Sequence, residues 1–471
     1  MWPVKLWPVS RRNILKRFAP YVRKPGSRNF AVDVKDNSVD SVPCVKLSRL
    51  IGPDTTPLAV AFSGGGDSTA LLSLVLKWAR GRPVHALIVD HGLRHGSCDE
   101  ARLALKRAVA MGAGAQILTC QWDGAIPTTG IQEKARNSRY HLLAKACQAI
   151  GARKLLLGHN QDDQVETVLM RKNAGSGWRG LAAMSERASY PVWPIVADLT
   201  IVRPLLFCTR AALRRYNRNN RLVWIDDPSN KNHQFTRIRV RDYLAGKANC
   251  QQNLLIMAKA SREVVREERE GITQFIQMFT KIYEWGGVGL LAGFNGGKFG
   301  MVAEALRYLI PAISGHAEAP NVQKRMQLAR KLRHADFGGA TLGGVQFVPR
   351  KHDILCVRDP GAVIGRAQIA TLPALKLPAN NPAIWDGRFK LSSKLDTVTI
   401  IALGAWEHKI PGDYRALLKT IPKAARPCLP LFIMDKRICH IPFVDDPASV
   451  HGFGTVSLVR TRLASLLGHC V

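Results

Sequence analysis

A short motif of small and polar residues separates a strand-like apolar run at 58–62 from a helix-compatible run at 70–78: Ser63, Gly64, Gly65, Gly66, Asp67 and Ser68. Glycine lets the backbone approach a phosphate closely, because it has no side chain and tolerates positive φ. Backbone N–H groups at such a turn, and at the N-terminus of the helix that follows, bind anions. The motif therefore predicts a nucleotide-phosphate site, with a tight capped turn as the alternative. No Gly-x-x-x-x-Gly-Lys-Ser/Thr pattern occurs, so it is not a Walker loop.

Three acids form a second candidate site directly after a strand-like run at 154–158. Asp162, Asp163 and Glu166 lie within about one turn at the start of an expected helix. Carboxylates at the carboxyl end of a strand can bind Mg²⁺ or position an amine nucleophile. Acids at a helix N-terminus also act as caps, which is the structural alternative.

Basic residues between these two motifs are candidates for phosphate contact. On a helix, Glu133, Arg136 and Tyr140 would share one face. Such a face alone is most often a solvated, salt-bridged surface. Beside a triphosphate site, Arg136 or Arg139 becomes a candidate phosphate clamp.

Two later segments carry further arginines. Trp178 and Arg179 lie in a glycine-rich segment at 175–180, which we interpret as a mobile loop able to contact RNA. The segment matches Gly-x-Gly-x-x-Gly but follows a helix, so a dinucleotide site is not expected there. Arg237, Arg239 and Arg241 alternate along the chain. On a strand they would share a face, and on an extended arm they would follow a phosphate backbone.

Alternating strand-like and helix-like runs surround these motifs. Strands are expected at 58–62, 84–89, 116–120 and 154–158, and helices at 69–80, 99–111, 132–149 and 163–172. This alternation predicts an α/β fold with a doubly wound parallel sheet. Ligands of such sheets bind at the carboxyl ends of the strands, which is where the motifs fall.

The chain beyond residue 250 predicts different elements. Residues 253–285 have helical spacing, and short strands are expected at 340–348, 354–357, 398–402, 431–434 and 438–441. Prolines between 373 and 382 mark a linker. The predicted organisation is a basic extension at 1–50, a nucleotide-binding catalytic domain at 55–245, a helical middle region at 250–365 and a small α+β C-terminal domain at 395–471.

The charge of the chain predicts a polyanionic partner. Its 471 residues include 68 Lys and Arg against 35 Asp and Glu, a formal net charge of +33. Nucleic acid is the simplest such partner, with a membrane surface or a general proteome bias as alternatives. No apolar run approaches the roughly 20 residues that a membrane span needs. The ten cysteines are scattered singly, without Cys-x-x-Cys, which predicts reduced thiols rather than a disulfide, zinc or iron–sulfur framework.

The first 50 residues are basic and poor in acids, with apolar residues interspersed. An organelle transit peptide, a disordered nucleic-acid-binding arm and an extension from a misplaced start codon remain three interpretations of this composition. The predicted location is cytoplasmic, or a mitochondrion or plastid if the segment is a transit peptide.

The hexapeptide resembles the PP-loop of the N-type ATP pyrophosphatases, which split ATP between its α and β phosphates. Further motifs follow it in one order: Asp-His-Gly-Leu at 90–93, Glu-x-x-Arg-x-x-Arg-Tyr at 133–140, Gly-His-x-x-Asp-Asp-x-x-Glu-Thr at 158–167, Gly-Ser-Gly-x-x-Gly-Leu at 175–181, Arg-Pro-Leu-Leu at 203–206 and Trp-x-x-Asp-Pro-Ser-Asn at 224–230. Together they resemble the tRNA(Ile)-lysidine synthase family. The resemblance is dense over 58–245 and looser downstream.

The resemblance implies a PP-loop ATPase fold and a two-step ligation. ATP would adenylate the C2 oxygen of the wobble cytidine in a tRNA(Ile) with a CAU anticodon. The ε-amine of free L-lysine would then displace AMP and leave lysidine, which changes codon reading from AUG to AUA. The middle and C-terminal regions would bind tRNA, and a homodimer is one assembly that the sequence allows.

The resemblance also implies roles for the candidate residues. The hexapeptide would bind ATP, with Asp67 and Asp162 or Asp163 contacting Mg²⁺ and either Asp163 or Glu166 binding or deprotonating the lysine ammonium. Seven residues are candidates for contact with tRNA or phosphate: Glu133, Arg136, Arg139, Arg179, Arg237, Arg239 and Arg241. Other PP-loop enzymes, such as a tRNA thiolase or a small-metabolite amidotransferase, and a non-catalytic basic RNA-binding protein are the alternatives.

Overall fold

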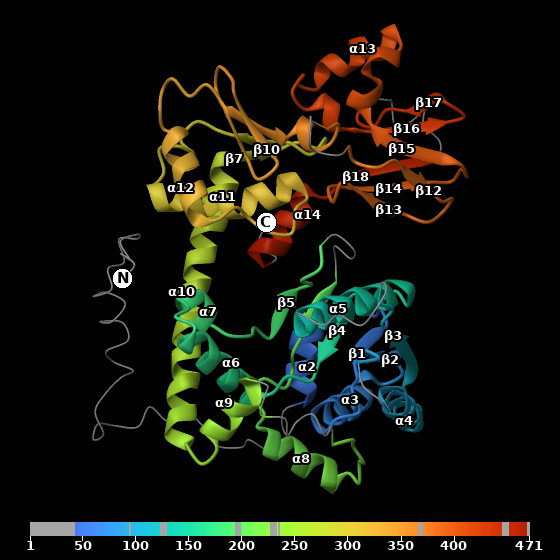
Figure 1. Cartoon of the computed structure of the whole chain (residues 1–471), viewed down its shortest axis with the longest axis vertical. Helices are drawn as coiled ribbons and strands as arrows, with labels where there is room; N and C mark the ends of the chain where they lie inside the picture. The colour runs from blue at the N-terminus through green and yellow to red at the C-terminus, as the bar shows by residue number, and fades with distance from the viewer. Residues whose placement is uncertain are drawn as a thin grey trace. The chain divides into compact units, whose positions relative to one another are not determined.

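A computed structural model describes residues 43–93, 96–122, 130–193, 199–226, 233, 236–365, 371–444 and 452–468. The predicted basic extension lies outside these residues up to position 42, as do residues 227–230 of the motif at 224–230. The chain divides into two compact units, with the boundary between Glu268 and Arg269 (Figure 1). Within the described residues, no helix combines the length and the apolar character that a membrane span requires.

The first unit contains a six-stranded sheet in the order β3-β2-β1-β4-β6-β5. Its strands are β1 (Leu58–Ala61), β2 (Val84–Asp90), β3 (Gly114–Thr119), β4 (Lys154–Leu157), β5 (Arg187–Ser189) and β6 (Thr200–Val202). All neighbouring strands are parallel except β5, which runs antiparallel to β6. The predicted parallel sheet is confirmed. β5 and β6 were not predicted, since segments of three residues are too short for a periodic signal.

Helices cover both faces of this sheet (Figure 1). The helices of the unit are α2 (Pro43–Ile51), α3 (Gly66–Ala79), α4 (Ser97–Ala110), α5 (Ile131–Ala149), α6 (Gln161–Asn173), α7 (Trp178–Leu181), α8 (Arg210–Asn219), α9 (Thr236–Leu244) and the first part of α10 (Ala248–Phe279). On β1, Leu58 and Val60 pack with α2, α3, α4 and α8, whereas Ala59 and Ala61 pack with α5. Because successive strand residues point to opposite faces, a strand buried on both faces is apolar throughout.

The order of the strands fixes where a ligand can bind. The chain runs from β1 outward through β2 to β3 and then returns to place β4 on the other side of β1. At such a reversal the connections leave in opposite directions, so a crevice opens at the carboxyl ends of the two central strands. The loops that follow β1 and β4 both lie at this crevice, and they carry the hexapeptide and the acidic motif.

The second unit consists of antiparallel sheets and helices. A five-stranded sheet has the order β7-β8-β11-β10-β9. Its strands are β7 (Thr280–Ile282), β8 (Val288–Leu290), β9 (Ala340–Leu342), β10 (Val345–Pro349) and β11 (Ile354–Arg358), and α11 (Phe299–Ser314) and α12 (Val322–Lys331) accompany them. The runs predicted as short strands at 340–348 and 354–357 correspond to β9 with β10 and to β11, whereas α11 and α12 were not predicted individually. The helix predicted at 253–285 ends at Phe279, where β-branched Thr280 and Ile282 begin a short hairpin strand.

The last part of the chain forms two further sheets in the orders β12-β15-β16-β17 and β13-β14-β18. Their strands are β12 (Leu375–Leu377), β13 (Ala383–Trp385), β14 (Phe389–Ser393), β15 (Val398–Ala402), β16 (Pro430–Met434), β17 (Arg437–His440) and β18 (Phe453–Ser457). The remaining helical segments are η2 (Pro360–Ala362), η3 (Leu403–Lys409), α13 (Gly412–Leu417), η4 (Leu418–Thr420), η5 (Arg426–Cys428) and α14 (Val459–Leu467). The strand-rich C-terminal part agrees with the predicted fold class.

Candidate active site

The hexapeptide forms the loop between β1 and the N-terminus of α3. Gly64 has a φ of +75°, and a Cβ placed on it would lie 2.8 Å from Ile225 Cδ1, so only glycine fits there without strain. Gly65 is the N-cap of α3 and makes no side-chain cap hydrogen bond. Ser68 Oγ instead donates to the carbonyl oxygen of Gly65 at 2.9 Å. The N-terminus of α3 is thus built as an anion site rather than closed by a capping side chain.

Two residues from later in the chain hold this loop from outside. The N–H of Ile225 donates to the carbonyl oxygen of Gly64 at 2.8 Å. Asn217, which is fully buried on α8, donates from Nδ2 to the carbonyl oxygen of Gly66, also at 2.8 Å. Sequence inspection missed both residues, because nothing in the spacing of α8 indicates that its polar side chain turns towards a loop some 150 positions earlier.

Asp67 lies where the loops after β1 and β4 meet. A Cβ on Gly158 would lie 3.2 Å from the backbone of Asp67, so this glycine allows the two loops to pack closely. Asp67 Oδ2 accepts a hydrogen bond from Asn160 Nδ2 at 3.0 Å, and Arg210 Nε lies 3.6 Å from the same oxygen. Among the described residues, Oδ1 of Asp67 has no hydrogen-bond partner.

The two aspartates of the acidic motif both act as caps. Asp163 and Asn160 form a capping box at the start of α6. Asp163 Oδ1 also lies 3.2 Å from Arg210 Nη2, and Asp162 Oδ2 accepts from the backbone N–H of Arg210 at 2.8 Å. The pKa of Asp67 is raised to about 6, mainly by burial; Arg210 opposes this shift, and Asp163 and Asp162 contribute to it. The two aspartates therefore cap helices and, at the same time, add negative charge next to Asp67.

Glu166 is enclosed by arginines. Its side chain is only 2% exposed, and its two oxygens accept from Arg237 Nε at 2.8 Å and Arg241 Nε at 2.9 Å, with Arg210 Nη1 at 3.6 Å. Arg237 and Arg241 are four positions apart on α9 and therefore share a face. Arg239 bonds instead to the carbonyl oxygen of His233. The expected strand or extended arm at 237–241 is wrong, because helical spacing lets two of its arginines satisfy one buried acid.

Arg210 is the cation that joins these acids, although no motif or spacing in the sequence marks it. Its guanidinium is within salt-bridge distance of Asp67, Asp163 and Glu166. Burial lowers its pKa, but the carboxylates outweigh burial and raise the pKa overall. Arg210 is the first residue of α8, so its backbone N–H has no partner within the helix. Asp162 accepts this N–H and thereby helps to hold Arg210 in place.

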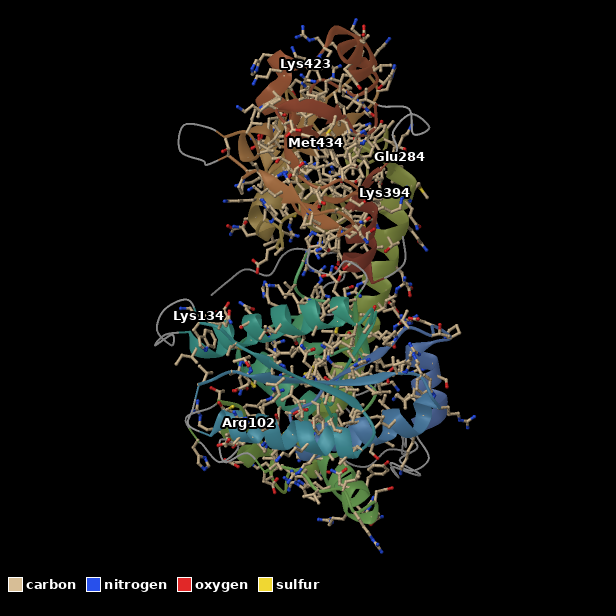
Figure 2. All side chains as sticks on the ribbon, turned by 90° about the vertical axis from the view of Figure 1, so that its right-hand side faces the viewer. Arg102, Lys134, Glu284, Lys394, Lys423 and Met434 are labelled. Carbon is tan, nitrogen blue, oxygen red and sulfur yellow. The ribbon has the colours of Figure 1, made fainter. Side chains whose placement is uncertain are left out.

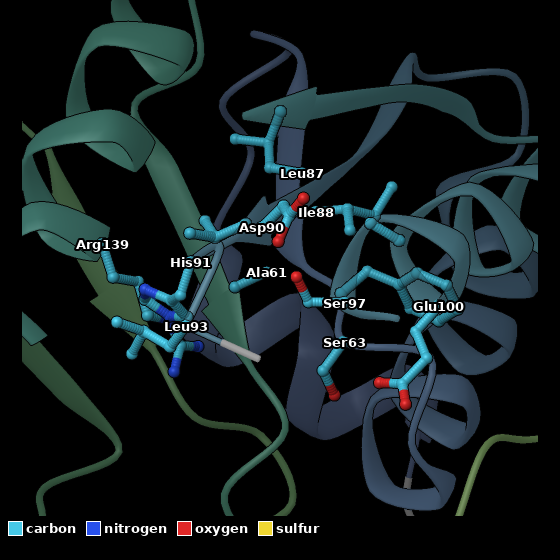
Figure 3. A pocket seen from close by; sticks show the side chains of 13 residues that line it. Ala61, Ser63, Leu87, Ile88, Asp90, His91, Leu93, Ser97, Glu100 and Arg139 are labelled. Atoms are coloured by element: carbon cyan, nitrogen blue, oxygen red, sulfur yellow. The ribbon is translucent and has the colours of Figure 1, made fainter. Parts of the chain in front are cut away.

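A cavity of about 350 Å³ adjoins the hexapeptide (Figure 3). The carboxyl ends of β1 and β2 and the first turn of α4 form most of its wall, with Leu87, Ile88 and Ala61 as apolar lining and Asp90 and Ser97 as polar lining. Such a volume and mixture of groups suit a nucleoside. The cavity lies beside the phosphate loop at the carboxyl ends of β1 and β2, next to the β1–β4 reversal rather than at it.

The basic candidates on α5 lie at this cavity and on its surface. Arg139 lines the cavity beside His91 (Figure 3). Burial, and secondarily Arg136, lower the pKa of the Arg139 guanidinium. Arg136 is exposed, donates to Tyr140 Oη at 3.3 Å and lies over the ring of Tyr140. Glu133 is exposed in the first turn of the same helix. The structure therefore brings Arg139, but not Glu133, into the cavity wall.

Arg179 does not lie in an open loop. It is in the short helix α7, where Nε and Nη2 both contact the carboxylate of Glu268, with Nε at 3.1 Å and Nη2 at 2.5 Å. Trp178 Nε1 lies 3.4 Å from the same carboxylate. This part of the predicted loop is a packed helical turn, because the bidentate pair holds it on α10.

The side chains of the site suit ATP, but they do not by themselves form a metal centre. The uncapped N-terminus of α3 and the adjacent cavity suit the phosphates and the nucleoside respectively. Among the described residues, no group of three or more His, Cys, Asp and Glu side chains is arranged to hold a metal ion. Asp67 and Asp162 are hard oxygen donors of the type that Mg²⁺ prefers, and phosphate oxygens would have to complete such a site.

The arrangement of loop, switch point and cavity defines a PP-loop nucleotide-binding protein. Residues 44–248 match the family model of the PP-loop domain. ATP binding follows from this class, as the hexapeptide predicted. The match spans the first unit from α2 to the start of α10.

Curated relatives identify the particular family. The chain is 38% identical over 333 residues to a tRNA(Ile)-lysidine synthase of Hyphomonas neptunium, covering 69% of this chain and 88% of the relative. It is 33% identical over 397 residues to that of Caulobacter vibrioides, covering 84% and 88%, and 35% identical over 291 residues to that of Rhodopseudomonas palustris, covering 59% and 80%. The chain belongs to the tRNA(Ile)-lysidine synthase family and is an enzyme. The predicted family, fold class and enzymatic nature are confirmed.

Proposed function

We propose that this enzyme ligates L-lysine to C2 of the wobble cytidine of a CAU-anticodon tRNA(Ile), through an adenylated tRNA intermediate. The observation that carries this proposal is the cluster of Arg210 with Asp162, Asp163 and Glu166 directly beside the ATP-binding loop that contains Asp67, in a chain of this family. A phosphate loop alone accounts for ATP cleavage, whereas an acidic cluster next to it suits an amine that must be bound and deprotonated.

The first step requires that the α-phosphate be held in line with the cytidine oxygen. The N-terminus of α3 and the hydroxyls of Ser63 and Ser68 bind the phosphates, and the cavity beside Arg139 orients the nucleoside. ATP supplies the adenylyl group, which turns the C2 oxygen into part of a good leaving group. Asp67 and Asp162 would hold Mg²⁺, which neutralises charge on the departing pyrophosphate.

The second step requires a carboxylate for the lysine amine. Asp163 and Glu166 are the two candidates from the sequence, and they differ in accessibility. The Asp163 side chain is 13% exposed, whereas that of Glu166 is 2% exposed and bonded through both oxygens to arginines. Asp163 is therefore the better partner for the incoming ammonium, and Glu166 positions the arginines around it.

The tRNA would be held through its phosphates by surfaces of both units. Exposed basic side chains occur on each, such as Arg102 and Lys134 in the first and Lys394 and Lys423 in the second (Figure 2). The net charge of +33 favours this mode of binding. We further propose that the enzyme acts in the cytoplasm, where a bacterial-type tRNA-modifying enzyme meets its substrate, and a homodimer is compatible with this role.

An assay with a tRNA(Ile) transcript, ATP and radiolabelled lysine tests the proposal. We expect lysine to enter the transcript at the CAU anticodon, with AMP and pyrophosphate released in equal amounts. A transcript whose wobble cytidine is replaced by uridine is the matched control and should accept no lysine. Folded protein that binds the transcript without incorporating lysine would overturn the proposed reaction.

A further inference from the structure

His159 is part of the active-site loop, but its side chain belongs neither to the phosphate loop nor to the acidic cluster. It lies between Gly158, which packs on Asp67, and Asn160, which caps α6 and bonds to Asp67 Oδ2. Its side chain is half-buried at the carboxyl end of β4. A histidine in this position is close to both the phosphate loop and the acidic cluster.

Arg203 fixes the tautomer of this histidine. Arg203 Nε donates to His159 Nδ1 at 3.3 Å, and a guanidinium can only donate. Nδ1 is therefore the acceptor, so the ring proton resides on Nε2. Arg203 is itself 8% exposed and anchored by donation from Nη1 to the carbonyl oxygen of Ser185 at 2.9 Å. The ring cannot gain a second proton on Nδ1 without facing this N–H.

The surrounding charges also keep the ring neutral. The pKa of His159 is lowered to about 3, mainly by burial, with smaller contributions in the same direction from Arg203, Arg139, Arg237 and Arg136. These arginines belong to α5, to α9 and to the residue directly after β6, and no carboxylate is among the groups that shift its pKa. A histidine in such a setting is a poor general base or acid near neutral pH. It is instead a permanent neutral hydrogen-bond donor.

The donor atom of this ring is available to a ligand. Among the described residues, Nε2 of His159 has no hydrogen-bond partner, although the ring is half-buried. The arginines on α5 and α9 that influence the ring make the region attractive to an anionic oxygen. A preorganised neutral donor of this kind stabilises charge that develops during a reaction, without the cost of desolvating a cation.

We propose that His159 Nε2–H donates to a non-bridging oxygen of the ATP α-phosphate during adenylation, and that Arg203 is its positioning residue. This inference rests on the proposed function. The donated proton stays on Nε2, and the hydrogen bond strengthens as negative charge grows on the phosphoryl oxygens. Arg203, whose side chain donates to Nδ1 of the imidazole and to the Ser185 carbonyl, acts through the ring.

Two substitutions separate this role from a structural one. In His159→Asn the amide oxygen can take the place of Nδ1 and accept from Arg203, but no donor reaches the position of Nε2. In His159→Gln the amide nitrogen reaches that position. We expect single-turnover adenylation of the tRNA transcript to fall about 100-fold in the Asn variant and to recover to within about 10-fold of wild type in the Gln variant. His85→Asn and His85→Gln, on β2 at the opposite end of the sheet, are the matched controls and should adenylate normally.

Nitrogen NMR of the imidazole supplies a readout that does not depend on turnover. In the intact protein, His159 should show a protonated Nε2 and an unprotonated Nδ1 between pH 5.5 and 8.5, and addition of a non-hydrolysable ATP analogue should shift Nε2 selectively. Titration of the ring within that range, or an Asn variant that adenylates as fast as wild type, would overturn the proposal. Wild-type protein with the expected NMR behaviour but no adenylated tRNA would instead count against the proposed function.

Discussion

Two groups of arginines in the first unit differ in how their charge is balanced. Arg210, Arg237 and Arg241, the acid-paired arginines, each contact the buried carboxylate of Glu166. Arg136 and Arg139, the α5 arginines, contact aromatic rings or line the cavity, and among the described residues no carboxylate lies within salt-bridge distance of either. The charge of the first group is balanced by a carboxylate of the protein, whereas the charge of the second group is available to an anionic ligand.

This difference separates residues that build the site from residues that bind substrate. A buried acid that has several arginine partners stabilises the fold around it and fixes the direction of each guanidinium. A guanidinium without an acid partner remains electrostatically unsatisfied until a phosphate arrives. Substitutions in the two groups should therefore affect different measurements.

Replacement of Asp67 should have the largest effect, because Asp67 belongs to the phosphate loop and also lies 3.6 Å from Arg210, one of the acid-paired arginines. We expect Asp67→Ala to reduce adenylation by about 10²–10³-fold, since it removes both the proposed metal contact and the partner of Asn160. Binding of the tRNA transcript, measured by filter retention, should remain within a factor of about two. Loss of tRNA binding together with adenylation would show that Asp67 supports the fold rather than the chemistry.

Replacement of Glu166 should mainly reduce stability. Glu166→Ala leaves the acid-paired arginines around an empty position, and removal of one partner from a buried ion cluster costs about 3–5 kcal/mol of unfolding free energy. Arg239 lies on the same helix as Arg237 but bonds to the carbonyl oxygen of His233 instead of Glu166. Arg239→Ala is therefore the control and should change the unfolding free energy by less than about 0.5 kcal/mol. Urea unfolding measures both. Equal losses of unfolding free energy in the two variants would contradict the conclusion that the ion pairs of Glu166 stabilise the fold and the contacts of Arg239 do not.

The hexapeptide and Arg210 show which parts of the site the sequence could predict and which it could not. The hexapeptide was recognisable because a glycine-rich loop between an apolar strand and a helix has few other physical explanations. Arg210 was not, because its role depends on α8 bringing an isolated arginine to acids some 45 positions earlier. The arginines at 237–241 alternate in sequence, and only the helical backbone shows that two of them face one acid. Local patterns thus predicted the phosphate site, while long-range ion pairs were visible only in three dimensions.

A pH series should sharpen the comparison at His159, which faces both groups of arginines. Its pKa is depressed in the folded protein, to about 3, so the unfolded chain binds a proton that the folded chain does not as pH falls below about 6.5. Stability from this group is therefore complete above that pH and is lost on acidification. At pH 5 the loss should be about 2 kcal/mol. His159→Gln should reduce the difference in urea midpoint between pH 7 and pH 5, and an unchanged difference would contradict the assignment.

The smallest effects should come from the α5 arginines, and these effects should appear in substrate binding rather than in stability. Arg139→Ala removes a cation from the cavity wall, so we expect the KM for ATP to rise about 10-fold with the KM for tRNA little changed. Arg136→Ala, on the exposed side of the same helix, should instead weaken tRNA binding and lower its salt dependence by about one phosphate contact.

These two substitutions serve as controls for each other, because they remove the same charge from adjacent turns of α5. Neither breaks an ion pair, so each should leave the urea midpoint within about 0.5 kcal/mol of wild type. If Arg139→Ala destabilised the protein as strongly as Glu166→Ala, Arg139 would have to be balanced inside the fold, and the two groups of arginines would not differ in kind. A change in the KM for ATP in Arg139→Ala alone would assign Arg139 to nucleotide binding and Arg136 to RNA binding.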